Sequence, residues 1–317
     1  MLERVKNLIS LEGYYLIKRM TDRYYIIRRQ ELGAGFFSNY CWVLGHLVFA
    51  RRMGYVPVVD MLNFKTLYSE DTPVDGEMNA WNYYFENVGE AGLEEAYRSG
   101  RYVFGREEPL HKYANKYCDA VYRFPSERAI DYYYPVIREH IRIRESLLND
   151  FRQNWHDNIP DGGRTIGVHI RGTDMKNNLG HPMPAATERY IRETETLLEK
   201  DREIRTVFLA TDERKIVEMF RDHFEGKCRV VINEAFRSEE QTASRQTGIH
   251  EQVIVNPRKN HKYRMGMEVL RDAWCLSGCD YLVCGHSNIT NVVILWNNHR
   301  FRQIVCVEGE NERQHEK

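Results

Sequence analysis

Short apolar runs alternate with longer amphipathic stretches through the second half of the chain. The runs are rich in β-branched and aromatic residues, which predicts strands, and the stretches between them carry apolar residues on one face, which predicts helices. Strands are predicted over residues 165–170, 206–210, 229–232 and 281–284, and helices over residues 184–200, 213–223, 263–276 and 288–296. This alternation is typical of a parallel, doubly wound sheet, whose ligand sites lie at the carboxyl ends of the strands.

The first half of the chain repeats this pattern less regularly. Residues 33–59 predict a glycine turn, a helix that stops at Gly54, and a short strand. Residues 71–89 combine turn-forming residues with clustered aromatic side chains, which predicts a long loop. One α/β unit is therefore expected here, followed by an irregular insertion.

A break in the pattern separates the two halves. Residues 128–155 are predicted to be helical, and the sequence Ile-Pro-Asp-Gly-Gly at residues 159–163 then supplies strong turn-forming residues. We place the domain boundary there. The prediction is an N-terminal α/β domain over residues 1–160 and a C-terminal Rossmann-like domain over residues 161–317.

Length and composition disfavour several classes of protein. With 317 residues, 42% of them hydrophobic, the chain can bury two cores. Its formal net charge of -1 gives no overall basic field, which disfavours a nucleic-acid partner. The seven cysteines are odd in number and scattered along the chain, as expected of reduced thiols in the cytoplasm.

Charged residues and the short length of the apolar runs bear on membrane association. The opening residues are interrupted by charges, and no apolar run is long enough to cross a bilayer, so we expect neither a signal peptide nor a membrane helix. Residues 14–29 are rich in Arg, Lys and Tyr and could contact an anionic membrane surface. We favour a solvated helix face for them. The predicted location is cytoplasmic, with a peripheral contact at the inner face of the membrane as the alternative.

The first candidate for chemistry is the sequence GVHIRGTD at residues 167–174, where a predicted strand ends in charged and polar residues. Arg171 stands at this end, and an arginine there offers a planar, permanently charged fork for phosphate oxygens. A pyrophosphate is the expected ligand. The alternative is that Arg171 pairs with Asp174 and only ties the loop, and we favour phosphate binding over it. Taken alone, His169 is better interpreted as a hydrogen-bonded structural histidine.

The second candidate is the sequence CGHSNIT at residues 284–290, in which a strand end and a glycine turn lead into a helix. Backbone N–H groups at a helix N-terminus can receive phosphate, and the hydroxyl of Ser287 can add a hydrogen bond. An ordinary helix cap by Ser287 or Asn288 explains the same residues. The segment alone does not decide between the two.

Two carboxylates complete the candidate set. Asp212 closes the strand over residues 206–210, and Asp272 lies in the predicted helix over residues 263–276. A carboxylate near the cleft could accept the N–H edge of guanine. Each could equally be a helix cap or a surface ion pair.

These segments together resemble a known family. HIRGTD, then LATD, then LRDAWCLSGCDYLVCGHSN, in this order and spacing, resemble the fucosyltransferases of the nodulation and core α1,6 type and, more distantly, the protein O-fucosyltransferases. The resemblance covers residues 164–297 and is weaker over residues 33–55. It implies a GT-B-like α/β fold of two Rossmann-like, doubly wound domains facing a cleft. It also implies an inverting, metal-independent glycosyltransferase that moves fucose from GDP-fucose to a glycan or lipid-linked glycan, with no cofactor beyond this donor.

The resemblance also implies roles for individual residues. Arg171 is expected to bind the β-phosphate and to assist departure of the nucleotide. His169 and Asp272 are expected to help hold the nucleotide, and Asp212 joins them as the carboxylate of the LATD segment. Ser287 and Asn288 are expected to line the phosphate site.

Two departures from the family pattern leave the catalytic base open. Gly172 stands where relatives of the core type have a second arginine, and Asn177 and Asn178 stand where those relatives carry a glutamate. An inverting transfer needs a base for the acceptor hydroxyl. Our hypothesis is Asp174, with Glu31 and Asp60 of the first half as substitutes.

Other functions are compatible with parts of this pattern. GDP-mannose or another nucleotide sugar could replace GDP-fucose, because nothing in the sequence reads the sugar directly. A catalytically silent protein that binds a nucleotide sugar or a glycan is a second alternative, favoured by the absent glutamate. A metal site at His169, Asp174 and His181 is disfavoured by the neighbouring Arg171.

Overall fold

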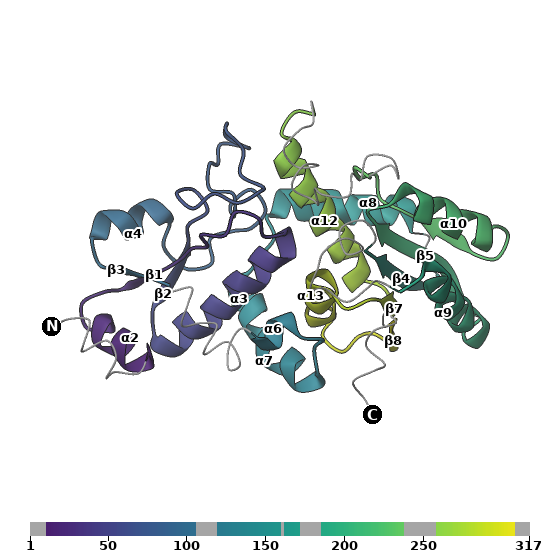
Figure 1. Cartoon of the computed structure of the whole chain (residues 1–317), viewed down its shortest axis with the longest axis horizontal. Coiled ribbons are helices and arrows are strands. Elements are labelled where there is room, and N and C mark those ends of the chain that lie inside the picture. The colour runs from purple at the N-terminus through teal and green to yellow at the C-terminus, as the bar shows by residue number, and fades with distance from the viewer. Residues whose placement is uncertain (1–10, 106–118, 160–161, 172–184, 238–257, 308–317) are drawn as a thin grey trace. The chain divides into compact units, whose positions relative to one another are not determined.

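The computed structural model describes residues 11–105, 119–159, 162–171, 185–237 and 258–307. By its internal contacts the chain divides into two compact units, Met1–Arg144 and Glu145–Lys317, which we call the N-unit and the C-unit. Both are α/β units with parallel sheets (Figure 1). Of the described helices, none combines the length and the apolar character that a bilayer span requires.

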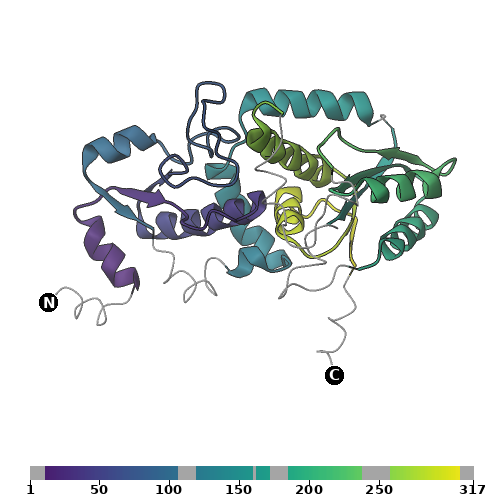
Figure 2. The same ribbon diagram turned by 45° about the horizontal axis from the view of Figure 1, so that its top comes forward.

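The N-unit contains a three-stranded parallel sheet in the order β2-β1-β3. Its strands are β1 (Tyr24–Ile27), β2 (Val56–Val59) and β3 (Tyr102–Phe104). Its helices are α2 (Leu11–Arg19), α3 (Phe36–Met53), α4 (Leu93–Ser99), α6 (Asp119–Tyr122) and α7 (Glu127–His140). The chain passes from β1 through α3 to β2, and from β2 through α4 to β3 on the other side of β1. These crossovers place α3 and α4 on opposite faces of the sheet (Figures 1 and 2).

The local chemistry explains the elements that were predicted here. Helix α3 ends at Gly54, which adopts a left-handed φ of 74° and donates its N–H to the carbonyls of Ala50 and Arg51. Residues 60–92, all of them described, form no named helix or strand, as the loop prediction requires.

Strand β1 differs from its prediction. Residues 14–29 were assigned to a solvated helix face, but only the first part is helical, in α2. The four residues of β1 are all buried, because β1 is the central strand and pairs on both sides. A short apolar run between charged neighbours gives too weak a period to be recognised as a strand.

The C-unit contains a five-stranded parallel sheet in the order β6-β5-β4-β7-β8. Its strands are β4 (Arg164–Ile170), β5 (Ile204–Thr211), β6 (Arg229–Val231), β7 (Tyr281–Cys284) and β8 (Gln303–Cys306). Its helices are α8 (Glu145–Asn158), α9 (Thr187–Lys200), α10 (Arg214–Phe224), α12 (His261–Ser277) and α13 (Asn288–Asn297). The first three strands run outward from β4, and β7 then returns to the other side of β4. This is the doubly wound arrangement predicted from the sequence.

Alternate residues of β4 face two layers of helices. Ile166 and Val168 pack in one core cluster with α9 and α10. Gly167 faces α12, where an added Cβ would lie 3.0 Å from Leu276 Cδ2 and 3.2 Å from Cys279 Sγ. The small residue therefore lets β4 and α12 approach closely. Helices α8 and α12 lie side by side in both views (Figures 1 and 2).

The position of α8 bears on the domain boundary. The prediction placed residues 145–158 in the first half, before a boundary at residue 160. In the structure α8 is grouped with the C-unit, where Trp155 packs edge to face on Trp274 and tilts against Phe208. Apolar periodicity reveals that a helix is amphipathic but not which sheet its apolar face covers.

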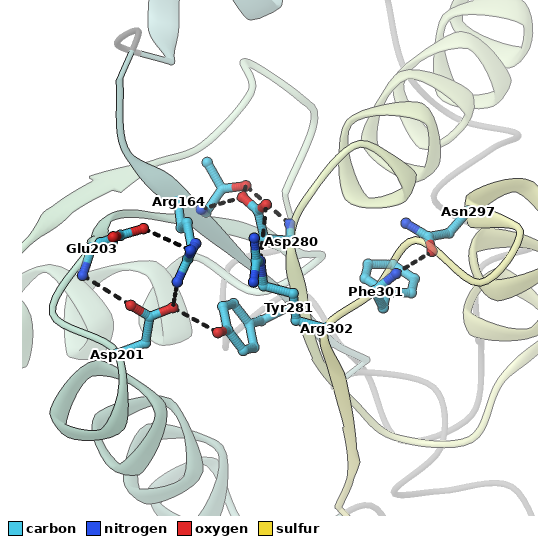
Figure 3. Close-up of polar contacts among 9 residues, drawn as sticks. Arg164, Asp201, Glu203, Asp280, Tyr281, Asn297, Phe301 and Arg302 are labelled. Carbon is cyan, nitrogen blue, oxygen red and sulfur yellow. Dashed lines mark hydrogen bonds and ion pairs between the residues drawn. The ribbon is translucent and has the colours of Figure 1, made fainter.

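The amino ends of β4 and β7 are joined by a polar network (Figure 3). The carboxylate of Asp201 accepts hydrogen bonds from Arg164 and from the Tyr281 hydroxyl, both at 2.6 Å. Beside it, Asp280 accepts from the backbone N–H of Thr165 at 2.8 Å. These contacts fasten the amino edge of the sheet, opposite to the edge where parallel strands place ligands.

Asp201 is expected to make stability depend on pH. The Tyr281 hydroxyl, and then Arg164, hold the pKa of Asp201 well below its ordinary value. The folded state therefore binds this proton more weakly than the unfolded state does, so the stabilisation is present above the ordinary aspartate pKa of about 4 and is lost as the pH falls below it. Asp201→Asn should lower the thermal unfolding midpoint at pH 7 by a few degrees.

The same comparison at acid pH provides the control. The difference between wild type and Asp201→Asn should shrink as the pH approaches about 3. Glu203→Gln is the matched variant, because that carboxylate contacts Arg164 but its side chain is 69% exposed. A difference that stays constant with pH, or an equal loss in Glu203→Gln, would contradict the assignment.

Candidate functional site

The carboxyl edge of the C-unit sheet collects the polar residues that follow its strands. Because the strands are parallel, Arg171 after β4, Asp212 after β5, Asn233 after β6 and Gly285 after β7 lie along one edge. The direction of winding reverses between β4 and β7, and such a switch point opens a crevice at the carboxyl end. The register pairs His169 directly with Cys284. Arg171 and the turn that begins at Gly285 therefore flank this crevice.

Helix α13 begins at this turn. Ser287 is its N-cap, and its Oγ accepts a hydrogen bond from the N–H of Thr290 at 3.2 Å. The helix-cap interpretation of Ser287 is thus correct. It leaves the first-turn amides of Asn288 and Ile289 directed out of the helix end, where the helix dipole favours an anion. The cap and an anion site at this terminus are compatible.

His169 connects β4 to the same turn. Thr290 Oγ1 donates to the carbonyl of Gly285 at 2.8 Å and lies 3.3 Å from His169 Nδ1. His169 is only 6% exposed, and its burial, followed by the charge of Arg171, lowers its pKa to about 3. The imidazole is therefore neutral at pH 7. It acts as a structural link below the crevice, as the sequence suggested for a histidine taken alone.

Gly285 is fixed by a neighbour from α9. A Cβ added at Gly285 would lie 2.6 Å from the hydroxyl of Tyr190, closer than real Cβ atoms approach. Tyr190 is itself buried, at 3% exposure. Only glycine therefore lets the turn after β7 pass beside this ring.

Asp272 lies toward the β6 side of the same edge. Its Oδ1 accepts a hydrogen bond from Asn233 Nδ2 at 2.7 Å. Burial of the carboxyl raises the pKa of Asp272 to about 6, an effect that Asn233, Arg271 and Arg237 partly offset. The carboxylate is thus held next to the end of β6 and is ionised at neutral pH.

Hydrogen bonds hold residues 233–237, which follow β6, against α12 near Asp272. Glu268 accepts from the N–H of Phe236 at 3.1 Å, and Arg271 donates to the carbonyl of Glu234. Arg237 donates to the carbonyl of Asn233 at 2.8 Å. These bonds bring polar backbone and side-chain groups together at this end of the sheet.

The remaining predicted residues have the following positions. Asp212 follows β5 and is partly exposed. It is not the cap of the following helix, because α10 begins at Arg214 with Glu213 as its N-cap. Thr211 Oγ1 accepts from the Glu213 N–H at 3.3 Å. Asp174 lies outside the described residues.

The two substitutes proposed for the base are engaged elsewhere. Asp60 is fully buried, and its two oxygens accept from the N–H groups of Leu62 and Asn63, from Asn63 Nδ2 and from the Tyr97 hydroxyl. A carboxylate with four such donors anchors the segment after β2 and has no site left for an acceptor proton. Glu31 is 66% exposed and pairs with Arg29 at 2.5 Å.

Sequence reasoning assigned no role to three residues at this edge, although Thr290 lies within the candidate segment 284–290. Asn233 follows its strand as Asp212 does, so the strand-end rule could have found it. Thr290 stands three residues after the cap Ser287, a position whose N–H a cap commonly binds. Tyr190 gives no sequence signal, because its contact with Gly285 exists only in the folded unit.

Comparison with solved structures identifies the fold. The α-1,6-fucosyltransferase NodZ soaked with GDP-fucose aligns with a TM-score of 0.56 at 17% identity, over 92% of this chain and 96% of that one. The chain has the fold of NodZ. NodZ from Bradyrhizobium aligns with a TM-score of 0.53 at 16% identity, over 86% of this chain and 92% of that one. The predicted GT-B-like class of two Rossmann-like units is thereby confirmed.

A further NodZ structure adds to this likeness. NodZ co-crystallised with GDP aligns with a TM-score of 0.50 at 16% identity, over 86% of this chain and 91% of that one. Neither a protein-family model nor a curated protein matches the sequence. At these identities the NodZ likeness establishes the fold, and a fold by itself does not establish an activity.

Proposed function

We propose that this chain is a glycosyltransferase that moves fucose from GDP-fucose to a glycan or glycoconjugate acceptor. The observation that carries the proposal is the switch point between β4 and β7 in a NodZ-like fold, where Arg171 and the N-terminus of α13 both lie at the carboxyl edge of the sheet. The NodZ structures that share this fold were soaked with GDP-fucose or co-crystallised with GDP. The proposal assigns the same donor to this chain.

In the proposed complex the pyrophosphate lies at the switch point. Arg171 binds the β-phosphate through its guanidinium fork, and the amides of Asn288 and Ile289 add hydrogen bonds along the helix dipole. His169 positions this turn through Thr290. Together these groups stabilise the charge that develops on the leaving GDP, so that the transfer needs no metal and no cofactor beyond the donor.

Guanine lies toward β5 and β6 in this arrangement. Adjacent strands are about 4.8 Å apart, so the end of β6 is on the order of 10 Å from the end of β4, a span that a nucleoside diphosphate can bridge. Asp272 accepts the N–H edge of guanine, and Asp212 lines the path between the base and the phosphates. The acceptor hydroxyl attacks the anomeric carbon with inversion, and Asp174 takes its proton.

The cytoplasm is the compartment we propose for this reaction. Cys275, Cys279 and Cys284 of the C-unit are buried thiols. Thiols that remain reduced are the rule where glutathione and thioredoxin act.

Binding of GDP is expected to weaken as the pH falls from 7 to 5. Only the ionised form of Asp272 accepts both N–H groups of guanine, and with a pKa of about 6 its ionised fraction falls roughly tenfold over this range. The same titration affects folding stability in the opposite direction. Because the pKa of Asp272 is raised, the folded state binds this proton more tightly than the unfolded state does. Protonation between about pH 6 and 4 therefore stabilises the folded state. Isothermal titration with GDP across the range measures the effect.

Two variants distinguish the titration of Asp272 from a general loss of GDP binding at acid pH. Asp272→Asn should bind GDP at least about tenfold more weakly at pH 7 and should show a flat profile near pH 6. Glu218→Gln, which alters an exposed carboxylate on α10, should keep the wild-type profile. A wild-type profile in Asp272→Asn would remove Asp272 from the guanine site.

Turnover tests the proposed function directly. The protein is incubated with GDP-fucose in EDTA and a panel of glycan acceptors, and mass spectrometry follows GDP release together with fucosylated product. Product with an anomeric configuration opposite to that of the donor is the expected result. Transfer from GDP-mannose and not from GDP-fucose would show that the proposed donor is wrong. Tight GDP-fucose binding without product on any acceptor would favour a catalytically silent binding protein.

A further inference from the structure

A cavity of about 750 Å³ lies in the N-unit, between the segment that follows β2 and the start of α4. Its apolar lining includes Leu62, Met78 and Leu93. Both the β2 end and the first residues of α4 are at the carboxyl edge of the sheet, since a crossover helix begins where the preceding strand ends. The volume is within the range of about 300–1,000 Å³ that is usual for sites of small ligands.

Hydrogen bonds within the protein fix several of the residues that line this cavity. Asp60, fully buried, holds both Asn63 and Tyr97, which line the cavity. Arg144 donates to the carbonyl of Asn82 at 3.3 Å. These bonds fix the residues around the cavity, which lowers the ordering cost when a ligand enters.

Four amide side chains contribute to the polar part of the lining, on Asn63, Asn79, Asn82 and Asn87. Asn82 Nδ2 donates to Asn87 Oδ1 at 2.9 Å. Within the described chain this is the hydrogen bond that joins their side chains. It leaves Asn82 Oδ1, the second N–H of Asn82 and both side-chain N–H groups of Asn87 for a ligand. The cavity therefore offers both donors and acceptors within reach of apolar side chains.

The charges around the cavity argue against an anionic ligand. Three carboxylates line it, on Glu77, Glu86 and Glu94, against two guanidinium groups, on Arg98 and Arg144. Both guanidinium groups are already engaged, because Arg98 pairs with Glu94 and Arg144 donates to the backbone carbonyl of Asn82. No surplus of positive charge remains for a phosphate or a carboxylate.

We propose that this cavity binds an uncharged saccharide. Sugar hydroxyls are both donors and acceptors, as the amides require, and the C–H face of a pyranose ring can pack on the apolar lining. That the saccharide is the acceptor of the reaction rests on the proposed transferase function, whereas the binding itself does not. The proposal thus names the acceptor class as a neutral glycan.

Gly92 provides a way to block the cavity without disturbing its wall. Its φ is -82°, which any residue adopts, and an added Cβ would contact only Asn87 Nδ2, at 3.9 Å. Gly92→Phe therefore directs its ring into the cavity. Thr72→Phe adds the same ring at an exposed position of the segment after β2 and is the matched control.

Methyl NMR of the full chain with labelled methionines gives the readout. Met78 lines the cavity, whereas Met20, 82% exposed on the chain after α2, does not. The probes are β1,4-linked tetrasaccharides of glucose, mannose and N-acetylglucosamine, with a hyaluronan tetrasaccharide as the anionic probe. At least one neutral probe should move the Met78 signal and leave that of Met20 unchanged. Gly92→Phe should weaken this binding at least tenfold, and Thr72→Phe should not.

The possible results either support or overturn the proposal. It is overturned if none of the neutral probes moves Met78, if the hyaluronan probe binds more tightly, or if Gly92→Phe binds like wild type. Should Gly92→Phe fail to fold, Asn82→Ala combined with Asn87→Ala removes the amides without adding bulk and must give the same loss. GDP titration of the same samples distinguishes failure of the saccharide proposal from failure of the proposed function, because the proposed donor site lies in the C-unit.

Discussion

Arg171→Ala is expected to weaken the binding of GDP by at least about 100-fold. Two hydrogen bonds from a guanidinium to a phosphate contribute about 1.5–3 kcal/mol each, and every 1.4 kcal/mol corresponds to a factor of ten in affinity. In the proposed complex Arg171 makes both of these bonds from its position after the buried strand β4, at the switch point. Isothermal titration in EDTA measures the loss. Arg171→Lys retains the charge but not the guanidinium fork, so its affinity for GDP should lie between those of wild type and Arg171→Ala.

The control for this variant lies at the opposite edge of the same sheet. Arg205 is an exposed arginine near the amino end of β5, and Arg205→Ala should bind GDP like wild type. Unfolding of all three variants should have midpoints close to that of wild type. If Arg171→Ala bound GDP within a factor of about three of wild type, the alternative in which Arg171 only ties the loop would stand.

Gly285→Ala is expected to lower both GDP affinity and stability. The new Cβ would meet the Tyr190 hydroxyl at 2.6 Å, so the turn into α13 or the buried ring has to move. Overpacking of this kind costs about 1–3 kcal/mol. Displacing the turn also moves the amides at the start of α13, so GDP binding should fall about tenfold or more. Thermal unfolding and GDP titration report the two effects.

A second substitution can relieve this clash. Tyr190→Phe removes the hydroxyl that the new methyl group meets, so the double variant should recover much of the affinity lost in Gly285→Ala. Gly92→Ala is the matched control, because its Cβ meets its nearest neighbour at an ordinary 3.9 Å. A double variant that is no better than Gly285→Ala would show that contact with Tyr190 is not the reason for glycine at this position.

The C-unit fold could be predicted from sequence because its strands are buried on both faces. Parallel strands of this kind appear as continuous apolar runs, and the helices between them show a clear amphipathic period. The runs at β4, β5 and β7 fit this description. Strand β8 was missed: it is an edge strand, three of its residues are only partly buried, and Cys306 is exposed.

The N-unit was harder to predict for the opposite reason. Its central strand β1 is only four residues long and is flanked by Arg23 and Arg28, so the charges around it dominate the local composition. The partner of α8 was equally hidden. Trp155 and Trp274 are far apart in sequence, and only the folded C-unit brings them together.

The candidate site was predictable where chemistry follows a strand directly. Arg171 and Ser287 stand out because polar residues interrupt an apolar run at the carboxyl end of β4 and after β7. The link from His169 through Thr290 was not predictable, since it depends on strand order and register. Asp60 shows the converse error: its type and its position after β2 suit a base, yet its four hydrogen bonds make it an anchor.

The central claim is that the C-unit holds a guanine nucleotide sugar without a metal ion. Isothermal titration of the wild-type chain with GDP-fucose in EDTA tests it most directly. The account predicts saturable binding of one GDP-fucose per chain, displaced by GDP and not by UDP. Absence of saturable binding, or binding that appears only when a divalent metal is restored, would contradict it.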